Sequence, residues 1–253
     1  MRILAGLLLC WVTSLAAAED RAISAAETAY AKGDYATAVE KWSEEALKEG
    51  VTAGRLSALG NAEWRLGRKG RAMVCWERAL LLSPRDPVAL AGIKHALGAG
   101  GTDRPTQTWS ENYAAFLGAD LWLILGAIGF WGTLLAVLVP KLRRQTMGDW
   151  TQRILITSAT LFALSIPGLY GAYTLASRAV VRRTDVPVKL TPTVLGEALN
   201  GTAEGDVLRT GRKLNGHTYV TSADGKGGWV KSTELEPIWG GTLPVNLDQP
   251  RAP

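Results

Sequence analysis

Two long apolar stretches without a charged residue constrain the fold of this chain more than any other feature. Residues 121–139 and residues 154–176 contain no Asp, Glu, Lys or Arg. About twenty apolar residues are enough for a helix to cross the hydrocarbon core of a bilayer. Two buried helices of a soluble protein are the alternative, but the length and all-round apolarity of these stretches favour membrane spans. We therefore expect transmembrane helices at 114–140 and 154–176.

The short segment between the two apolar stretches is basic. Residues 141–153 contain four Lys or Arg side chains and one acidic residue, Asp149. Short loops rich in Lys and Arg stay on the cytoplasmic side of a membrane. This predicts a cytoplasmic loop at 141–153, with both long flanks outside. Arg178, Arg182 and Arg183 follow the second stretch on the predicted outer side and run against this rule.

The first residues read as a secretory signal. Residues 1–18 contain one Arg, then a short apolar run, and end in Ala16-Ala17-Ala18. This pattern predicts a signal peptide cleaved after Ala18, which places the following segment outside as well. A lipoprotein signal that uses Cys10 and an uncleaved signal anchor are the alternatives. After cleavage Cys75 is the remaining cysteine, so no internal disulfide is expected.

The apolar stretches carry small residues but no ionisable residue in their interiors. Gly132 and Ala136, like Gly168 and Ala172, lie four positions apart, a spacing that lets helices approach closely. A transporter or proton path would need polar groups inside the membrane, so we interpret the stretches as an anchor and an association surface. Four aromatic residues near the span ends are expected to form an interfacial belt: Tyr113, Trp122, Trp150 and Tyr173.

Residues 19–98 contain a repeat with a period of thirty-four residues. The matching pairs are Gly33 and Gly67, Ala38 and Ala72, and Trp42 and Trp76. This period is typical of helical-hairpin repeats, in which small residues let two helices approach and large aromatics fill the space between hairpins. In the second repeat we assign further packing or terminating roles to Leu59, Gly60, Ala79 and Pro84. Cys75 falls within this packing pattern, where a free Cys acts as a small hydrophobe.

The second repeat resembles the tetratricopeptide family closely, and the first resembles it less well. The resemblance implies an all-α helical-repeat domain whose first helices line a groove for peptides or protein tails. Asn61 resembles the Asn of carboxylate-clamp repeats, although the companion Lys position holds Ser57. The alternative is that Trp64 packs under a neighbouring helix and Asn61 only faces water. By position, the partner-binding candidates are Glu27, Tyr30, Ser57, Asn61, Trp64 and Arg65.

Residues 180–238 carry short β-rich runs separated by turn residues, which predicts a small all-β barrel. The segments "VKLTP", "EGDVL" and "ADGKGGWV" resemble the pattern of bacterial SH3-like domains, which are credited with binding cell-wall peptides or proteins. The resemblance assigns core positions to Pro192, Gly228, Trp229 and Val230. We expect a linker at 99–113 and a disordered tail at 239–253.

Catalysis, metal binding, cofactor binding and nucleic-acid binding are not expected. The two histidines, His95 and His217, lie in different predicted domains, and no metal-ligand spacing, phosphate loop or nucleophile elbow is present. The net charge is +5, but the basic residues form no single block.

The order of these segments resembles the BatE-type proteins of the Bacteroides aerotolerance group. The fold class implied is a multidomain membrane protein with tetratricopeptide repeats, two transmembrane helices and an SH3-like barrel. The resemblance implies an envelope complex with membrane-anchored von Willebrand A-type proteins that supports stress tolerance. We expect a multi-pass protein of the bacterial inner membrane, with both terminal domains on the periplasmic side, that acts as a protein-binding scaffold. A peptidoglycan sensor or tether, and an assembly factor acting through its spans, are the alternatives.

Overall fold

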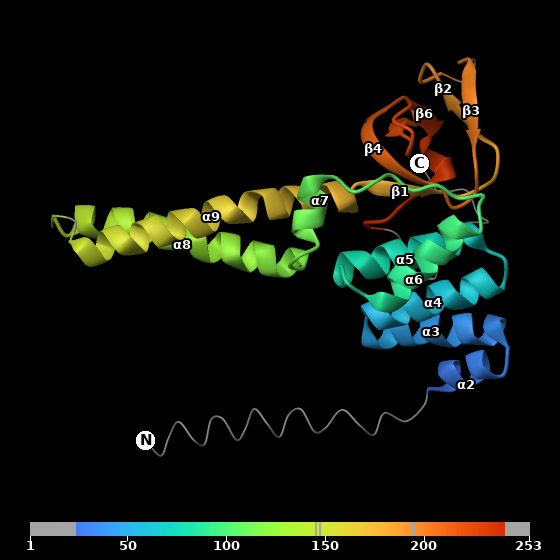
Figure 1. The fold of residues 1–253 in the computed structure, drawn as a ribbon, viewed down its shortest axis with the longest axis horizontal. Helices are drawn as coiled ribbons and strands as arrows, with labels where there is room; N and C mark the ends of the chain where they lie inside the picture. Colours follow the sequence, from blue (N-terminus) through green and yellow to red (C-terminus); the bar gives the residue numbers. More distant parts are fainter. Residues whose placement is uncertain (1–23, 145, 147, 194–195, 241–253) are drawn as a thin grey trace.

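A computed structural model describes residues 24–144, 146, 148–193 and 196–240. Within these residues the chain forms a helical region (α2 to α6), a sheet region (β1 to β7) and an apolar hairpin of two long helices, α8 and α9. Figure 1 shows the hairpin projecting as a rod from the place where the other two regions meet. This mixed helix-and-sheet architecture with two membrane-length helices confirms the coarse fold expectation. The predicted signal peptide and residues 241–253 of the predicted tail lie outside the described residues.

The helical region consists of antiparallel helices whose starts are set by capping side chains. Ser24, Asp34, Thr52 and Asp86 each accept a hydrogen bond from a backbone N–H in the first turn of the helix that follows. Such caps satisfy donors that have no partner inside the helix. The helices are α2 (Ala25–Ala31), α3 (Tyr35–Glu49), α4 (Ala53–Arg65), α5 (Lys69–Leu82) and α6 (Pro87–Gly98).

The indole of Trp76 organises the core of the helical region. A Cβ atom on Gly60 would lie 2.5 Å from this ring, and one on Gly92 would also overlap it. These two glycines therefore open the slot between α4 and α6 that the ring fills. The other repeat positions in the helices, Ala38, Trp42, Leu59, Ala72 and Ala79, are buried as well. Gly33 and Gly67 lie between helices at φ 81° and 77°, and Pro84 follows α5.

The sheet region is antiparallel and strongly curved (Figure 1). Its described strands follow the order β3-β2-β6-β5-β4-β1-β7, so β3 and β7 are the edges. Val181, Val188, Leu208, Val220 and Val230 are among its buried core residues. The strands are β1 (Arg178–Val181), β2 (Val186–Lys189), β3 (Ala198–Thr202), β4 (Val207–Leu214), β5 (His217–Thr221), β6 (Gly227–Lys231) and β7 (Leu235–Pro237).

The apolar hairpin contains α8 (Ala119–Leu142) and α9 (Asp149–Ala176), both long and apolar enough to cross a membrane. Small residues bring the two helices together. A Cβ atom on Gly129 would lie 2.6 Å from the Phe162 nitrogen, and one on Gly132 would lie 2.5 Å from the Ser158 hydroxyl. Gly168 is likewise covered by the ring of Trp122. The small residues that we interpreted as an association surface therefore serve a contact within this chain.

Trp122 does not belong to the aromatic belt expected at the span ends. Its side chain is 5% exposed, stacks on Tyr113 with ring centroids 4.7 Å apart, and donates to the Ala114 carbonyl at 3.2 Å. Its burial follows from the space that Gly168 leaves on α9. Trp150 and Tyr173 are exposed as expected.

The segment predicted as a linker, 99–113, is folded. Residues 99–108, which we call the strap, run between the helical region and the sheet region. The Val207 N–H donates to the Asp103 carbonyl at 2.9 Å, and the Asp103 N–H donates to the Asp206 carboxylate at 2.7 Å. The strap leads into a short helix, α7 (Trp109–Ala114), and α8 begins at Ala119, not at the predicted residue 114.

The helical region and the sheet region share one apolar core. Val180, Val207 and Ile238 pack in the same cluster as the helical residues around Trp76. Arg78 on α5 pairs with Glu236 at 2.9 Å, and both side chains are buried. The Gly70 N–H, in the first turn of α5, donates to the Glu204 carboxylate at 2.9 Å. An acidic side chain from the sheet region thus caps a helix of the helical region, where the helix dipole favours it.

A buried carboxylate on α7 joins the hairpin to the sheet. Glu111 is fully buried, and its Oε2 atom lies 2.9 Å from the guanidinium groups of both Arg178 and Arg209. Burial alone would raise the pKa of Glu111, but the Thr108 N–H and the two arginines outweigh burial and hold the pKa below its ordinary value. On the helical side, Arg104 of the strap pairs in turn with buried Glu77.

The contact between α7 and α9 gives a first prediction. A Cβ atom on Gly171 would overlap the carbonyl of Ser110, so Gly171→Ala must push α7 away from α9. We expect a loss of roughly 1–3 kcal/mol in the free energy of unfolding. The measurement is thermal unfolding of the full chain in detergent. The control is Gly118→Ala, because a Cβ atom there meets nothing within 4 Å. Equal stability of the two variants would contradict the packing.

Glu111 gives a second prediction. Glu111→Gln leaves two arginines without their shared anion, and breaking a buried pair costs about 3–5 kcal/mol. Glu234→Gln is the control, since its partner Arg183 is exposed and 3.9 Å away; we expect a loss of less than about 1 kcal/mol there. Chemical unfolding in detergent compares the two variants.

The pH dependence of the same variant follows from the lowered pKa. The stability that Glu111 supplies is complete above the ordinary carboxyl pKa of about 4.3 and is lost as the pH falls through the lower folded-state pKa. The gap in unfolding free energy between wild type and Glu111→Gln should therefore shrink below about pH 4. If the difference in unfolding free energy between wild type and Glu111→Gln stays constant down to pH 2, Glu111 stabilises the fold through packing and not through its charge.

Candidate functional site

The predicted groove residues of α4 are largely engaged inside the protein. Ser57 is buried, and its hydroxyl donates to Asp86 at 2.9 Å. The Asn61 side-chain oxygen accepts from the Trp76 indole N–H at 3.2 Å. These bonds use the Ser57 hydroxyl and the side-chain oxygen of Asn61, whereas a carboxylate would accept from the Asn61 amide N–H groups, which the bond to Trp76 does not involve. Ser57 is therefore not a surface contact in this structure, since α6 begins directly over it.

The remaining groove candidates lie closer to the surface. Trp64 is half-buried against the rings of Trp76 and His95, as the packing alternative expected. Arg65 is exposed, with its guanidinium 6.0 Å from the centre of the Tyr35 ring. Tyr30 and Glu27 on α2 are half-buried and exposed respectively, and Glu27 closes a capping box with Ser24. Among the predicted partner-binding residues, Ser57 is therefore buried, and Arg65 and Glu27 are exposed. Asn61, Trp64 and Tyr30 are half-buried.

The SH3-like core positions fall in the sheet region. Val230 and Gly228 lie on β6, where a Cβ atom on Gly228 would overlap Val188. Trp229 is largely buried and makes an edge contact with Tyr219. Pro192 is half-buried in the loop after β2.

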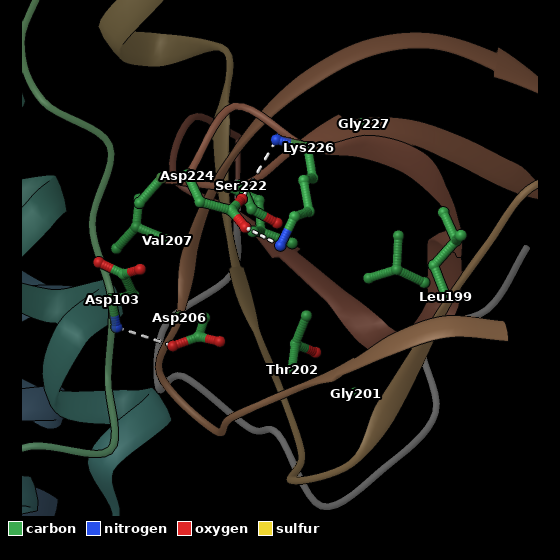
Figure 2. A pocket seen from close by; sticks show the side chains of 13 residues that line it. Asp103, Leu199, Gly201, Thr202, Asp206, Val207, Ser222, Asp224, Lys226 and Gly227 are labelled. Carbon is green, nitrogen blue, oxygen red and sulfur yellow. Dashed lines mark hydrogen bonds and ion pairs between the residues drawn. The ribbon is translucent and has the colours of Figure 1, made fainter.

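A pocket lies between the strap and β3. It encloses about 550 Å³, within the range of pockets that bind small ligands or peptide side chains. Figure 2 shows Asp103 and Asp206 at one end, Leu199 at the other, and the β5–β6 turn with Asp224 and Lys226 between them. We call it the acidic pocket, because three carboxylates and one ammonium group line it.

The pKa values of two carboxylates in the acidic pocket are shifted in opposite directions. Burial raises the pKa of Asp206, although its oxygens accept from the N–H groups of Ala203 and Asp103. Hydrogen bonds from Lys226 lower the pKa of Asp224, and the two side chains pair at 2.9 Å. By its lining of three carboxylates against one ammonium group, the acidic pocket suits a cationic group.

One wall of the acidic pocket is an edge strand. β3 pairs only with β2 in the described sheet, which leaves its outer backbone groups open to another strand. Leu199 on β3 and Val188 on β2 add apolar surface beside the carboxylates. An extended peptide can add to such an edge through its main chain and place side chains in the adjoining pocket.

Sequence reasoning missed these pocket residues as a group. Asp206 and Asp224 lie within the segments "EGDVL" and "ADGKGGWV", whose sequences predict an SH3-like pattern and not a pocket. Asp103 lay in the predicted linker. Nothing in the sequence indicated that the strap returns to the sheet, because its bonds to Asp206 and Val207 cross about a hundred positions.

No group of three or more His, Cys, Asp or Glu side chains in the described part of the chain is placed to hold a metal ion. His95 packs on Trp64, and His217 bonds to the Asn215 carbonyl at 2.9 Å. Cys75 is buried, and burial raises the pKa of its thiol to about 12.

No protein-family model, curated protein or solved structure matches this chain. The tetratricopeptide, SH3-like and BatE-type resemblances therefore rest on the sequence motifs alone.

Cys75 gives a third prediction. With a thiol pKa of about 12, the thiolate fraction at neutral pH is about three orders of magnitude below that of a free cysteine. In a Cys10→Ser background, we expect maleimide to label the folded protein extremely slowly and the SDS-denatured protein at the ordinary rate. Mass spectrometry at pH 7.5 measures both. Fast labelling of the folded protein would show an accessible thiol and contradict its role as a packing residue.

Proposed function

We propose that this chain is a membrane-anchored scaffold of the bacterial cell envelope that binds a segment of another protein outside the cytoplasmic membrane. The observation that carries the proposal is the acidic pocket beside an open strand edge, on a body joined without a flexible linker to two membrane-length helices.

The charge distribution supports this orientation of the anchor. The basic segment 141–153 joins the far ends of α8 and α9, as expected for a cytoplasmic loop. Of the three arginines that run against this orientation, Arg178 and Arg182 are buried, and Arg183 is exposed. Arg178 pairs with Glu111, so it does not act as a free positive charge at the membrane surface.

The pocket suggests the chemistry of the bound segment. An extended chain would add to the outer edge of β3, with an apolar side chain near Leu199. A Lys, an Arg or a free amino group would lie among Asp103, Asp206 and Asp224. Main-chain bonds supply affinity in this mode, and the pocket supplies specificity.

The exposed groove residues Arg65 and Glu27, with half-buried Tyr30, remain a predicted second contact. In the setting implied by the BatE-type resemblance, the partner is a membrane-anchored von Willebrand A-type protein of a stress-tolerance complex. Two contacts on one anchor raise the effective concentration of each for its target.

A peptidoglycan sensor or tether is the second candidate. The observation that favours it is the same pocket, because wall peptides also offer amino groups to a cluster of carboxylates. The test is co-sedimentation with purified sacculi. It requires the full chain in detergent, since Val180, Val207 and Ile238 bury the sheet region against the helical region.

The fourth prediction tests the protein partner. A photo-crosslinking residue at Leu199 should capture a protein in cells, and one at exposed Glu40 on α3 should not. Asp224→Lys should lower recovery of that protein on the order of tenfold, because it places a positive charge at the mouth of the pocket.

Crosslinks at Glu40 alone would contradict the assignment of the pocket. Binding of the wild-type chain to sacculi, lost in Asp224→Lys and without any protein crosslink at Leu199, would favour the wall-binding alternative.

A further inference from the structure

Four large exposed side chains and one arginine surround the end of the apolar hairpin where it meets the rest of the protein. Leu82 is 52% exposed, Phe116 64%, and Tyr173 and Trp239 70% each. The Arg85 guanidinium lies 5.0 Å from the centre of the Phe116 ring. We call Leu82, Arg85, Phe116, Tyr173 and Trp239 the collar.

The collar residues come from distant parts of the sequence but meet at one place. A small apolar pocket of about 60 Å³ lies where these parts join. Trp239 lines it directly, together with Leu81 and Pro84 from the end of α5, Ala119 from the start of α8 and Ala172 from the end of α9. The collar is therefore continuous with the apolar surface of the hairpin.

The length of the hairpin places the collar at the edge of the hydrocarbon core. The core is about 30 Å thick, which corresponds to about twenty helical residues at about 1.5 Å each. The charge-free stretch of α9 begins at Ile154. If Ile154 marks the inner boundary, the outer boundary falls near Tyr173. The charge-free stretch of α8 begins at residue 121, five positions after Phe116.

No flexible segment separates the hairpin from the collar. Only Ser177 lies between α9 and β1, and α7 packs across α9 through Ser110 and Gly171. The Tyr113 hydroxyl also donates to the Leu164 carbonyl at 3.0 Å. With the spans in a bilayer, the rest of the protein has no freedom to move away from the lipid surface.

We propose that the collar inserts into the interfacial layer of the outer leaflet, so that the helical region and the sheet region rest on the lipid. This proposal rests on the proposed membrane anchoring. Trp, Tyr and Arg are the side chains enriched at that depth, where one end is apolar and the other is wet. Leu and Phe add apolar contact. β2 and β3 lie on the far side of the protein from the hairpin (Figure 1), so the acidic pocket is held away from the membrane.

The test uses single cysteines in a Cys10→Ser background, in which Cys75 stays buried. The collar probes are Leu82→Cys and Trp239→Cys. Leu190→Cys, directly after β2 and 53% exposed, is the matched control away from the hairpin. Ile128→Cys on α8, 57% exposed, is the control inside the span. Each full chain carries a bimane label in nanodiscs with one copy per disc, made from phosphatidylcholine and phosphatidylglycerol with or without a lipid that bears a nitroxide at carbon 5.

We expect the nitroxide lipid to quench the labels at positions 82, 239 and 128 by more than about half, and the label at 190 hardly at all. Quenching at 128 alone, with 82 and 239 behaving like 190, would overturn the collar proposal and leave the anchor intact. Absence of quenching at 128 would overturn the anchor itself. A third outcome is that the collar labels are unquenched in single-copy discs, while Leu82→Cys chains crosslink to each other in liposomes. This outcome would assign the collar to a contact with a second copy of the chain and would also overturn the proposal.

Discussion

The architecture depends on the shared ion pairs of Glu111. One buried carboxylate on α7 is held by Arg178 at the start of β1 and by Arg209 on β4, each at 2.9 Å. Glu111 lies on α7, which leads into the apolar hairpin, and Arg178 lies on β1, which follows it. Arg209 lies on β4, the strand that pairs with β1. A buried charge without a partner would cost several kcal/mol, so the two ion pairs favour this arrangement of α7, β1 and β4. The network thus fixes the orientation of the hairpin relative to the sheet.

A second set of polar contacts extends the same constraint to the helical region. Arg104 of the strap pairs with Glu77, Arg78 pairs with Glu236, and Glu204 caps α5. Each joins α5 to a segment that lies beside the sheet or within it. Because these contacts surround a shared apolar core, the two regions form one body and not two modules on a flexible tether. The acidic pocket, whose wall includes the strap, consequently has a fixed position relative to the apolar hairpin.

Features that depend on neighbouring residues were predictable from the sequence, and features that depend on distant ones were not. The charge-free stretches predicted two membrane-length helices, and the thirty-four-residue spacing identified Trp42 and Trp76, which the structure buries. The spacing of apolar residues along a helix is a local pattern, so it predicts which side chains are buried without knowledge of distant contacts. Glu111 and Arg178 are sixty-seven positions apart, and nothing local marks them as partners. The bond from Trp76 to the side-chain oxygen of Asn61 is likewise a tertiary contact that no local pattern marks.

The strap links the acidic pocket to α7, which packs against the apolar hairpin. Asp103 lines the pocket and bonds to Asp206 and Val207, and Arg104 pairs with Glu77. Arg209 reaches from β4 to the Thr106 carbonyl at 2.7 Å as well as to Glu111. Displacement of the strap at Asp103 would disturb contacts that also hold α7. The shape of the acidic pocket is therefore set partly by the same contacts that hold α7.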